Sequence, residues 1–319
     1  MSRISNTETA EHVAACLQLA ILIEINAPKP GNVHQNANFH KTYYEHFLAS
    51  AVATAPSFKT ATTQGIKVAE NKISLSQIGI GRIIKDAVKR INTWQHGGNT
   101  LLGTIILLSP IAVAAGKTLK ENNNTFDLQK IRKNIRAVTT ATTPEDAAAL
   151  YEAIDIAKPG GLNKAPKFDA TNPSSKQELL KTHTTLFDVF KISAKYDSIS
   201  NEWTNNYPIL FNTGLPFLKK QVETKNSINN AVVHTFLKIL AENPDTLIIR
   251  KVGQKKAKEI SNQARQILQL GGLKTRKGKK ALATFDENLR DTENKLNPGT
   301  TADLITATLA LHILSGYRP

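Results

Sequence analysis

The 319-residue sequence is poor in two residue types that often define a fold. It contains a single cysteine, Cys16, so no disulfide can form within the chain. A lone cysteine in an apolar segment is typical of a small core residue in a reducing compartment. Aromatic residues make up only 6% of the chain, whereas alanine, leucine, isoleucine and lysine are plentiful, which favours helices over a β-sandwich.

The sequence also shows no pattern of a targeting segment or of a membrane-spanning helix. The first eleven residues are polar and acidic, without the apolar centre of a signal peptide. The longest apolar run, Leu101 to Ala115, contains glycine, threonine, serine and proline and is too short to span a bilayer. The sequence therefore predicts a cytoplasmic protein without a membrane partner.

Several motifs that carry a known chemistry do not occur. There is no GxxxxGK[ST] phosphate loop, no GxGxxG after a predicted strand, no cysteine–histidine metal cluster and no HExxH helix. These absences argue against the P-loop, Rossmann and zinc-protease classes. No basic helix carries the aromatic residues that favour recognition of bases, so a nucleic-acid partner is not expected.

Acidic residues are few beside basic ones. The 26 aspartates and glutamates face 41 lysines and arginines, which gives a net charge of +15. Such an excess attracts anions, including nucleic acids, acidic lipids and polyphosphate ligands, although a basic proteome background explains it equally well. The two densest runs, Lys251 to Lys258 and Lys274 to Lys280, are interpreted as solvated faces.

What is present is a helical pattern over the whole chain. Apolar residues recur at helical spacing, and no segment alternates as a strand does for more than a few residues. We expect an all-α protein with one compact multi-helix domain over residues 1–319 and buried central helices. The expected helices span residues 5–26, 42–55, 100–116, 143–158, 179–201, 229–241, 254–270 and 300–316, and residues 67–94 are expected to form one or two more, broken near Gly79 and Gly81. A basic turn is expected at 274–280 and a flexible Pro/Ser/Asn-rich loop near 163–176.

A loop after the first helix is the centre of this interpretation. Proline cannot continue a helix and pushes the preceding residue toward extended backbone, so the helix ends at Pro28-Lys29-Pro30-Gly31. We expect the loop to present Lys29, Gly31, Asn32 and His34. His34 can donate or accept a proton there, or be an ordinary surface histidine.

Carboxylates lie on both sides of this loop. Glu24 falls within an apolar run, where an ionised group needs a partner, so it is either a site residue or a group that bonds loop N–H groups. Thr42 and Glu45 have the spacing of a capping box that starts the next helix. A carboxylate at the end of one helix and another at the start of the next would form the floor of a site for a charged substrate.

Three further loops precede helices and carry similar residues. These are Gly97 to Thr100, Asp245 to Lys251, and Asn297 to Asp303, in which Thr300 has the position of an N-cap and Asp303 that of an acid in the first turn. Free N–H groups at helix starts and nearby Arg or Lys bind phosphate oxygens, and carboxylates hold Mg²⁺. The set suits a nucleoside triphosphate with Mg²⁺, without a ligand set being assigned for the metal.

Seven segments occur in a fixed order: PKPGNV, FLASA, GGNTxxG, TTPEDA, DSISNEW, DTLIIRKxG and NPGxTADLI. Together they resemble the triphosphoribosyl-dephospho-CoA synthase family (ATP:dephospho-CoA triphosphoribosyl transferase) over about residues 11–314. The resemblance implies an all-α pentosyltransferase that joins the ribose C1 of ATP to the 2′-hydroxyl of dephospho-CoA and releases adenine. It implies nucleotide and CoA-like small molecules as ligands, with ATP as a substrate.

The resemblance also suggests roles for individual residues. Breaking the N-glycosidic bond places positive charge on the ribose, so Glu24 or Asp303 is expected to supply a carboxylate, with Glu45 as a further candidate. Lys29, Arg250 and Lys251 are expected to hold phosphates. The residues expected at the nucleotide are Lys29, Gly31, Asn32, His34, Asn99, Thr100, Asp245, Arg250, Lys251, Asn297 and Gly299.

The sequence departs from the family pattern at three positions. His34 stands where the better-known members have an acidic residue, and Leu101 and Leu102 stand where they have His-Lys. Two alternatives therefore remain beside the synthase activity. One is a catalytically degenerate nucleotide-binding protein, and the other is a ribosyl-phosphate transferase with a different acceptor.

Overall fold

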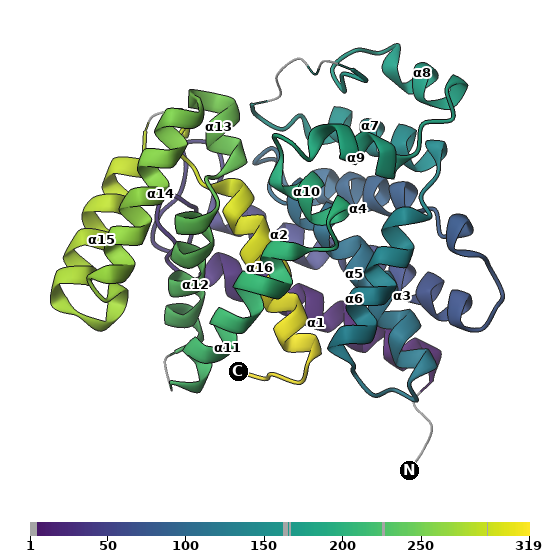
Figure 1. Cartoon of the computed structure of the whole chain (residues 1–319), viewed down its shortest axis with the longest axis horizontal. Coiled ribbons are helices and arrows are strands. Elements are labelled where there is room, and N and C mark those ends of the chain that lie inside the picture. The colour runs from purple at the N-terminus through teal and green to yellow at the C-terminus, as the bar shows by residue number, and fades with distance from the viewer. Residues whose placement is uncertain (1–4, 162–164, 166, 225–226, 292) are drawn as a thin grey trace.

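The chain folds into helices joined by loops (Figure 1). The computed structural model describes residues 5–161, 165, 167–224, 227–291 and 293–319. Across these described ranges no strand forms, and the β-type pairing found is an isolated bridge between His34 and Ala37. The expected all-α fold is confirmed.

The helices follow one another along the whole chain, and Figure 1 places α14 and α15 at one edge of the molecule. Their bounds are α1 (Asn6–Asn26), α2 (Tyr44–Ala53), α3 (Ala55–Ala69), η1 (Leu75–Gln77), α4 (Ile80–Trp94), α5 (Leu102–Glu121), α6 (Leu128–Thr140), α7 (Pro144–Ala157), α8 (Ser175–Lys181), α9 (Leu186–Ser193), α10 (Ser198–Thr204), η2 (Leu210–Gly214), α11 (Leu215–Glu223), α12 (Ile228–Glu242), α13 (Thr246–Val252), α14 (Gln254–Gln269), η3 (Gly272–Lys274), α15 (Arg276–Leu289) and α16 (Gly299–Leu314).

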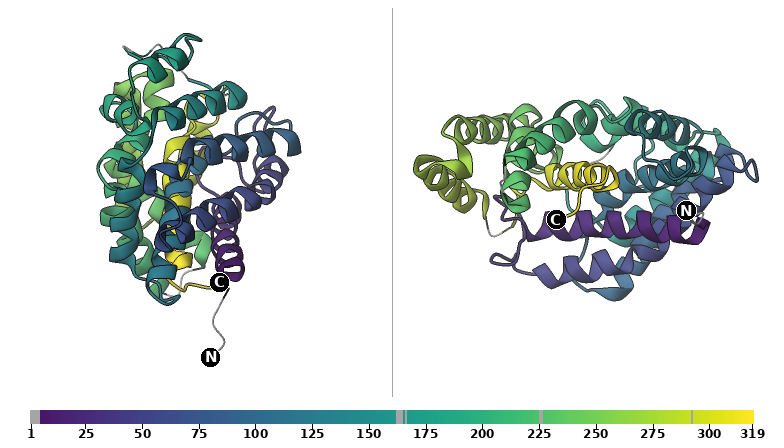
Figure 2. Two further views of the ribbon diagram at one scale, coloured as in Figure 1. Left: turned by 90° about the vertical axis from the view of Figure 1, so that its right-hand side faces the viewer. Right: turned by 90° about the horizontal axis from the view of Figure 1, so that it is seen from below.

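Three helices from distant parts of the sequence, α1, α5 and α16, contact one another at the centre of the fold. Figure 2 shows α16 lying alongside α1. Helix α5 is long and apolar enough to cross a membrane, but 94% of its apolar stretch is buried inside the protein, which is the pattern of a core helix. The expectation of buried central helices is confirmed, because a helix that is apolar on all sides must be covered on all sides.

Glycine allows α3 to cross α5 at short range. A Cβ atom on Gly65 would lie 1.9 Å from the carbonyl oxygen of Val113, and one on Gly116 would lie 2.2 Å from that of Thr62. Both glycines therefore permit backbone-to-backbone contact that any side chain would prevent. This crossing fixes α5 in the core, with its first turn beside the cavity described below.

Capping boxes start α1 and α7, where the expected helices 5–26 and 143–158 begin. At α1, Ser5 Oγ accepts a hydrogen bond from the N–H of Glu8, and the carboxylate of Glu8 accepts one from the N–H of Ser5. Thr143 and Asp146 form the same pair at α7, and Asp146 also accepts a hydrogen bond from the N–H of Gly81. Asp146 is thus a capping residue of α7.

The capping box expected for α2 from Thr42 and Glu45 is wrong. The hydroxyl of Thr42 donates to the carbonyl oxygen of Gly97 instead of capping α2, and the N–H of Tyr43 donates to the imidazole of His46. The histidine ring occupies the position that the capping box assigned to Glu45, which is exposed. Thr42 therefore forms a tertiary hydrogen bond to the Gly97 loop in place of a local hydrogen bond at the start of α2.

Thr300 is likewise not the N-cap of α16, which is Pro298. The N–H of Thr301 instead donates to the carboxylate of Asp245, a residue from a different segment. Capping by a remote side chain leaves no local sequence pattern, which is why the spacing of Thr300 and Asp303 was misleading.

The helical segment expected over 179–201 is divided into parts of α8, α9 and α10. Thr185 and Asp188 form a capping box that starts α9, and Asp197 caps α10. The expected basic turn at 274–280 is also wrong, because Thr275 caps α15 and most of that run is helical. The apolar pattern is continuous over 179–201 and absent over 274–280. In both segments a Thr or Asp cap starts a new helix that this pattern does not indicate.

The loop expected near 163–176 falls partly on residues 163, 164 and 166, which lie outside the described residues. Of the rest, the carbonyl oxygen of Phe168 accepts a hydrogen bond of 2.5 Å from the hydroxyl of Tyr151, and α8 begins at Ser175. The flexibility of this loop stays a prediction.

Candidate active site

The Pro-Lys-Pro-Gly turn and the Asn-Pro-Gly turn, from opposite ends of the chain, lie against each other. Gly31 has a φ of +70°, and a Cβ atom on it would lie 3.1 Å from Cδ of Pro298. The N–H of Gly31 donates to Asp286 at 2.7 Å, which ties the turn to α15. The loops therefore meet as the sequence interpretation requires.

A cavity of about 820 Å³ opens beside these turns. This volume lies within the range of small-molecule sites, which is about 300–1,000 Å³. The residues of the expected site that line it are Glu24, Asn32, Asn99, Thr100, Arg250, Lys251, Asn297, Gly299 and Asp303. Residues separated by most of the chain thus share one hollow.

Glu24 lies at the cavity and is paired from behind by Lys29. The exposed fractions of the two residues are 4% and 0%, and Nζ of Lys29 lies 3.1 Å from Oε1 of Glu24. The ammonium group also donates to the carbonyl oxygens of Glu24 and Ala27. Burial raises the pKa of Glu24 and lowers the pKa of Lys29, and the opposite charge of each partner counteracts that shift.

Lys29 is therefore placed behind the cavity and does not line it. All its hydrogen-bond donors are directed to Glu24 and Ala27, so the geometry gives it the role of fixing a carboxylate. The same pair explains why a charge is tolerated in the apolar last turns of α1.

Asp303 lines the cavity from α16 and accepts a hydrogen bond of 2.6 Å from the hydroxyl of Thr104 on α5. A Cβ atom on Gly103 would lie 2.1 Å from Oδ2 of Asp303, so the glycine makes room for the carboxylate. Burial raises the pKa of Asp303 to about 7, and the negative charges of Glu24 and Asp245 act in the same direction. This carboxyl group can accept or donate a proton near neutral pH.

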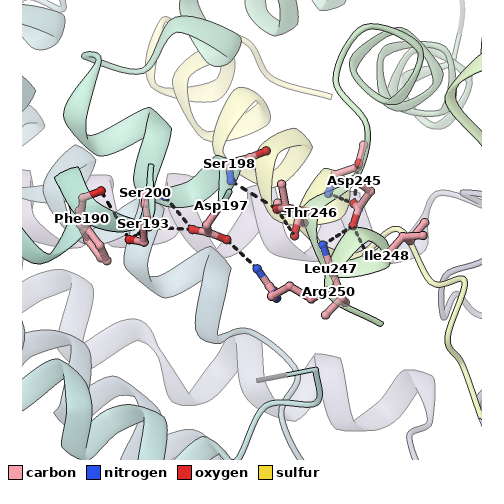
Figure 3. A network of polar contacts seen from close by, with 12 residues as sticks. Phe190, Ser193, Asp197, Ser198, Ser200, Asp245, Thr246, Leu247, Ile248 and Arg250 are labelled. Carbon is pink, nitrogen blue, oxygen red and sulfur yellow. Dashed lines mark hydrogen bonds and ion pairs between the residues drawn. The ribbon is translucent and has the colours of Figure 1, made fainter. Parts of the chain in front are cut away.

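Asp245 is buried and does not line the cavity. One of its oxygens accepts hydrogen bonds from the N–H groups of Leu247 and Ile248, and the other accepts from the N–H and hydroxyl of Thr301 (Figure 3). Burial raises its pKa, and these hydrogen bonds oppose the rise. The carboxylate joins the starts of α13 and α16, and thereby positions Arg250 relative to Asp303.

Arg250 reaches the cavity wall in a fixed orientation. Its Nη1 donates to Oδ1 of Asp197 at 2.7 Å, and Oδ2 of Asp197 accepts from the N–H of Ser200 at the start of α10 (Figure 3). The side chain of Arg250 is 26% exposed. A guanidinium group held in this way is prepared to bind an anion in the cavity.

Lys251 and Asn297 complete this side of the cavity. Nζ of Lys251 donates to the carbonyl oxygen of Asn294 at 2.8 Å, and burial lowers the pKa of Lys251. Oδ1 of Asn297 is buried and has no hydrogen-bond partner among the described residues. A buried amide oxygen without a partner is costly, which favours a ligand donor at this point.

The start of α5 is held by its own loop. Oδ1 of Asn99 accepts a hydrogen bond from the N–H of Leu102, and the hydroxyls of Thr100 and Ser50 lie 2.8 Å apart. Both Asn99 and Thr100 line the cavity, so they can contact a ligand while they order the loop.

Four expected residues besides Lys29 lie outside the cavity lining: Gly31, His34, Glu45 and Asp245. Arg290 lies beside His34, with its Nη2 3.4 Å from Nε2 of the ring. Burial, together with the positive charges of Arg290 and Lys29, lowers the pKa of His34 to about 4, so its ring is neutral at pH 7.

Several lining residues were missed by sequence reasoning. They are Gly103, Thr104, Lys158, Phe168, Asp169, Phe190, Tyr196 and Asp197. Gly103 belongs to the GGNTxxG motif and Asp197 to the DSISNEW motif, so the sequence motifs could have indicated these two as site residues. Phe168, Phe190 and Tyr196 come from irregular or short helical segments whose position in space has no sequence signature.

The fold and the cavity define an all-helical protein with a site of nucleotide size, whose lining includes carboxylates, an arginine and lysines. The sequence matches the model of the family "ATP:dephospho-CoA triphosphoribosyl transferase" over residues 10–319. The chain therefore belongs to the ATP:dephospho-CoA triphosphoribosyl transferase family.

Relatives of known name agree with this assignment. A protein of Vibrio cholerae named probable 2-(5″-triphosphoribosyl)-3′-dephosphocoenzyme-A synthase is 25% identical over 298 residues, which cover 92% of this chain and 85% of the relative. One of the same name from Pseudomonas fluorescens is 24% identical over 306 residues, 95% and 91% of the two chains.

The fold also has a counterpart among solved structures. The crystal structure of a candidate triphosphoribosyl-dephospho-CoA synthase from Archaeoglobus fulgidus superimposes with a TM-score of 0.61 at 23% identity. The match covers 85% of this chain and all of the other. At this identity the likeness supports the fold alone.

Proposed function

We propose that this protein transfers the triphosphoribosyl unit of ATP to the 2′-hydroxyl of dephospho-CoA and releases adenine. The family supports the reaction, and one structural observation carries it. Glu24 and Asp303, one from each end of the chain, line a single cavity of about 820 Å³. Two carboxylates in one site are what glycosyl transfer through a positively charged ribose requires.

Glu24 is the carboxylate that faces the ribose in this proposal. The bond between ribose C1 and the adenine nitrogen breaks, and a bond between C1 and the acceptor oxygen forms. Positive charge develops on the ribose ring in between, and a fixed negative charge stabilises it. Lys29 holds Glu24 in place, so the carboxylate does not have to reorganise during the reaction.

Asp303 moves the proton. The 2′-hydroxyl of the acceptor loses a proton as its oxygen attacks C1, and adenine needs one as it leaves. A carboxyl group with a pKa of about 7 can take the first proton and return it to solvent or to the leaving base. Thr104 orients Asp303 through its hydrogen bond.

Arg250 and Lys251 hold the triphosphate, which stays on the transferred unit. Asn32, Asn99, Thr100, Asn297 and Gly299 provide the polar contacts to the ribose and the base or to the acceptor. Gly31, His34 and Asp245 support the site from behind its wall, and a contribution of Glu45 stays a prediction.

Mg²⁺ is the proposed metal, bound mainly through the phosphates. The described residues offer no group of three or more His, Cys, Asp or Glu placed to hold an ion. This donor set fits Mg²⁺, which takes one or two carboxylates and substrate phosphates and keeps several waters. Asp169 lines the cavity and would hold it, where it would neutralise phosphate charge. We also propose that the protein is cytoplasmic, because its proposed substrates are ATP and a precursor of CoA.

A direct assay tests this function. The protein is incubated with ATP, Mg²⁺ and dephospho-CoA, and adenine is quantified while the product is weighed by mass spectrometry. We expect adenine and a product with the summed mass of ATP and dephospho-CoA less that of adenine, in equal amounts. ADP or phosphate without adenine would overturn the proposal.

One observation favours a second candidate, a ribosyl-phosphate transferase with another acceptor. Leu101 and Leu102 line the cavity where the family pattern has His-Lys, so this part of the site is apolar. Adenine release with other hydroxyl acceptors, but not with dephospho-CoA, would support it. If ATP raises the melting temperature and no acceptor gives adenine, the protein is a nucleotide-binding protein without this activity.

A further inference from the structure

Lys158 has an unusual backbone conformation at the mouth of the cavity. It follows the last turn of α7 with a φ of +44°, in the left-handed region. Glycine and asparagine tolerate this region best, and other residues pay about 1–2 kcal/mol for it. Among the described non-glycine residues with positive φ, five of nine are asparagines, so a lysine here is an exception.

The segment after Lys158 packs on α13, which carries the cations of the proposed phosphate site. A Cβ atom on Gly161 would lie 3.2 Å from Cγ of Lys251 and 3.4 Å from Cδ1 of Leu247. Lys158 and Gly160 line the cavity together with Arg250 and Lys251. Two segments that are distant in sequence thus contribute Lys158, Arg250 and Lys251 to the lining of this cavity, which also includes Lys167.

The three cations differ in what already holds them. Arg250 is engaged by Asp197, and Lys251 donates to a carbonyl oxygen. The ammonium group of Lys158 has no hydrogen-bond or ion-pair partner within the described ranges, and its side chain is exposed. Of these three cations, Lys158 therefore has the most capacity for a new anionic partner.

Leu247 connects the start of α16 to the turn that follows Lys158. Leu247, which contacts the turn at Gly161, also lies 2.8 Å from where a Cβ atom of Gly299 would be. Gly299 lies one helical turn before Asp303 on α16. Leu247 therefore lies between the start of α16, which carries Asp303, and the turn that follows Lys158, and it is on the same helix as Arg250 and Lys251.

We propose that Lys158 binds the terminal phosphate of the donor nucleotide and so selects a triphosphate over a monophosphate. The proposal rests on the proposed function and adds a specificity residue to it. With the ribose near Glu24 and Asp303, the first phosphates meet Arg250 and Lys251, and the last one meets Lys158. A monophosphate is too short to reach it.

Nucleotide affinities of one variant test this inference. Lys158→Asn removes the ammonium group and keeps a residue that tolerates the left-handed conformation, so the fold should keep its melting temperature. Calorimetric titration with ATP and with AMP, both with Mg²⁺, is compared between wild type and variant. We expect about tenfold weaker ATP binding, as for one hydrogen bond to a charged group, and less than twofold change for AMP.

Two controls separate the possible outcomes. Lys158→Arg keeps a cation and should retain ATP affinity, and Lys89→Ala removes an exposed lysine on α4 and should change nothing. Equal losses for ATP and AMP, or unchanged ATP binding by Lys158→Asn, would overturn the role of Lys158 alone. A wild-type protein that binds no ATP would overturn the proposed function itself.

Discussion

The hydroxyl of Thr104 donates a hydrogen bond of 2.6 Å to the carboxylate of Asp303. The contact joins the beginnings of α5 and α16, two core helices that are 199 residues apart at these positions. Gly103 makes the approach possible, because its missing side chain leaves space for the carboxylate. The GGNTxxG and NPGxTADLI motifs therefore belong to one structural unit.

Replacing Thr104 by valine should shift the pH dependence of the reaction. The hydrogen bond stabilises the ionised form of Asp303 and lowers its pKa, so its loss raises the pKa further. The acidic limb of the plot of kcat against pH should then move to higher pH. Thr235→Val, which removes a buried hydroxyl on α12, is the matched control and should leave the limb in place. A limb that stays fixed in Thr104→Val would contradict this role.

Asp303→Asn should lower kcat by at least about a hundredfold, as expected for loss of a general base. Its effect on stability depends on pH. The folded-state pKa of about 7 lies above the usual value, so wild type loses stability as pH rises from about 4 through 7. The asparagine variant escapes that loss, and its melting temperature relative to wild type should increase between pH 5 and pH 8. A relative decrease over this range would show that the ionised carboxylate stabilises the fold.

Lys29→Met should destabilise the protein by about 3 kcal/mol or more, because it leaves the Glu24 carboxylate buried without a partner. The double variant Glu24→Gln, Lys29→Met removes both charges and should recover much of the loss. Urea unfolding at pH 7 measures both values. Equal destabilisation in the single and double variants would mean that the pair is not the source of the effect.

Asp197→Asn should raise the KM for ATP severalfold and change kcat little, since Arg250 loses its partner but asparagine still caps α10. Asp127→Asn at the start of α6 is the matched control, because Asp127 caps its helix and forms no ion pair with the residues that the structure describes. If both variants behave alike, the effect comes from capping and not from Arg250.

Much of the scaffold follows from the sequence because its causes are local. The apolar circumference of α5, the capping boxes at Ser5 and Thr143, and the turn at Gly31 each depend on neighbouring residues. The convergence of the Gly31 and Asn-Pro-Gly turns was inferred from the similar composition of the loops that precede helices, and the packing of Gly31 on Pro298 agrees with it.

The remaining features depend on contacts between distant segments. Lys29 was expected at a phosphate. It instead forms an ion pair with the buried carboxylate of Glu24, so that each charge has its partner within the protein. Asp245 was expected at the nucleotide, but it supplies the cap that the local residues of α16 lack. The spacing of residues in the sequence could not identify Glu24 as the partner of Lys29 or Thr301 as the partner of Asp245. Several polar groups could have formed these contacts, and the packing of distant segments decides which of them do.

The measurement that tests the central claim most directly is adenine release by wild type and Glu24→Gln, each with saturating ATP and dephospho-CoA. The claim is that the Glu24 carboxylate stabilises charge on the ribose as its bond to adenine breaks. The account predicts that wild type releases adenine, and that Glu24→Gln binds ATP with similar affinity but releases adenine at least about a hundredfold more slowly. Release at the wild-type rate by a folded Glu24→Gln variant would contradict it.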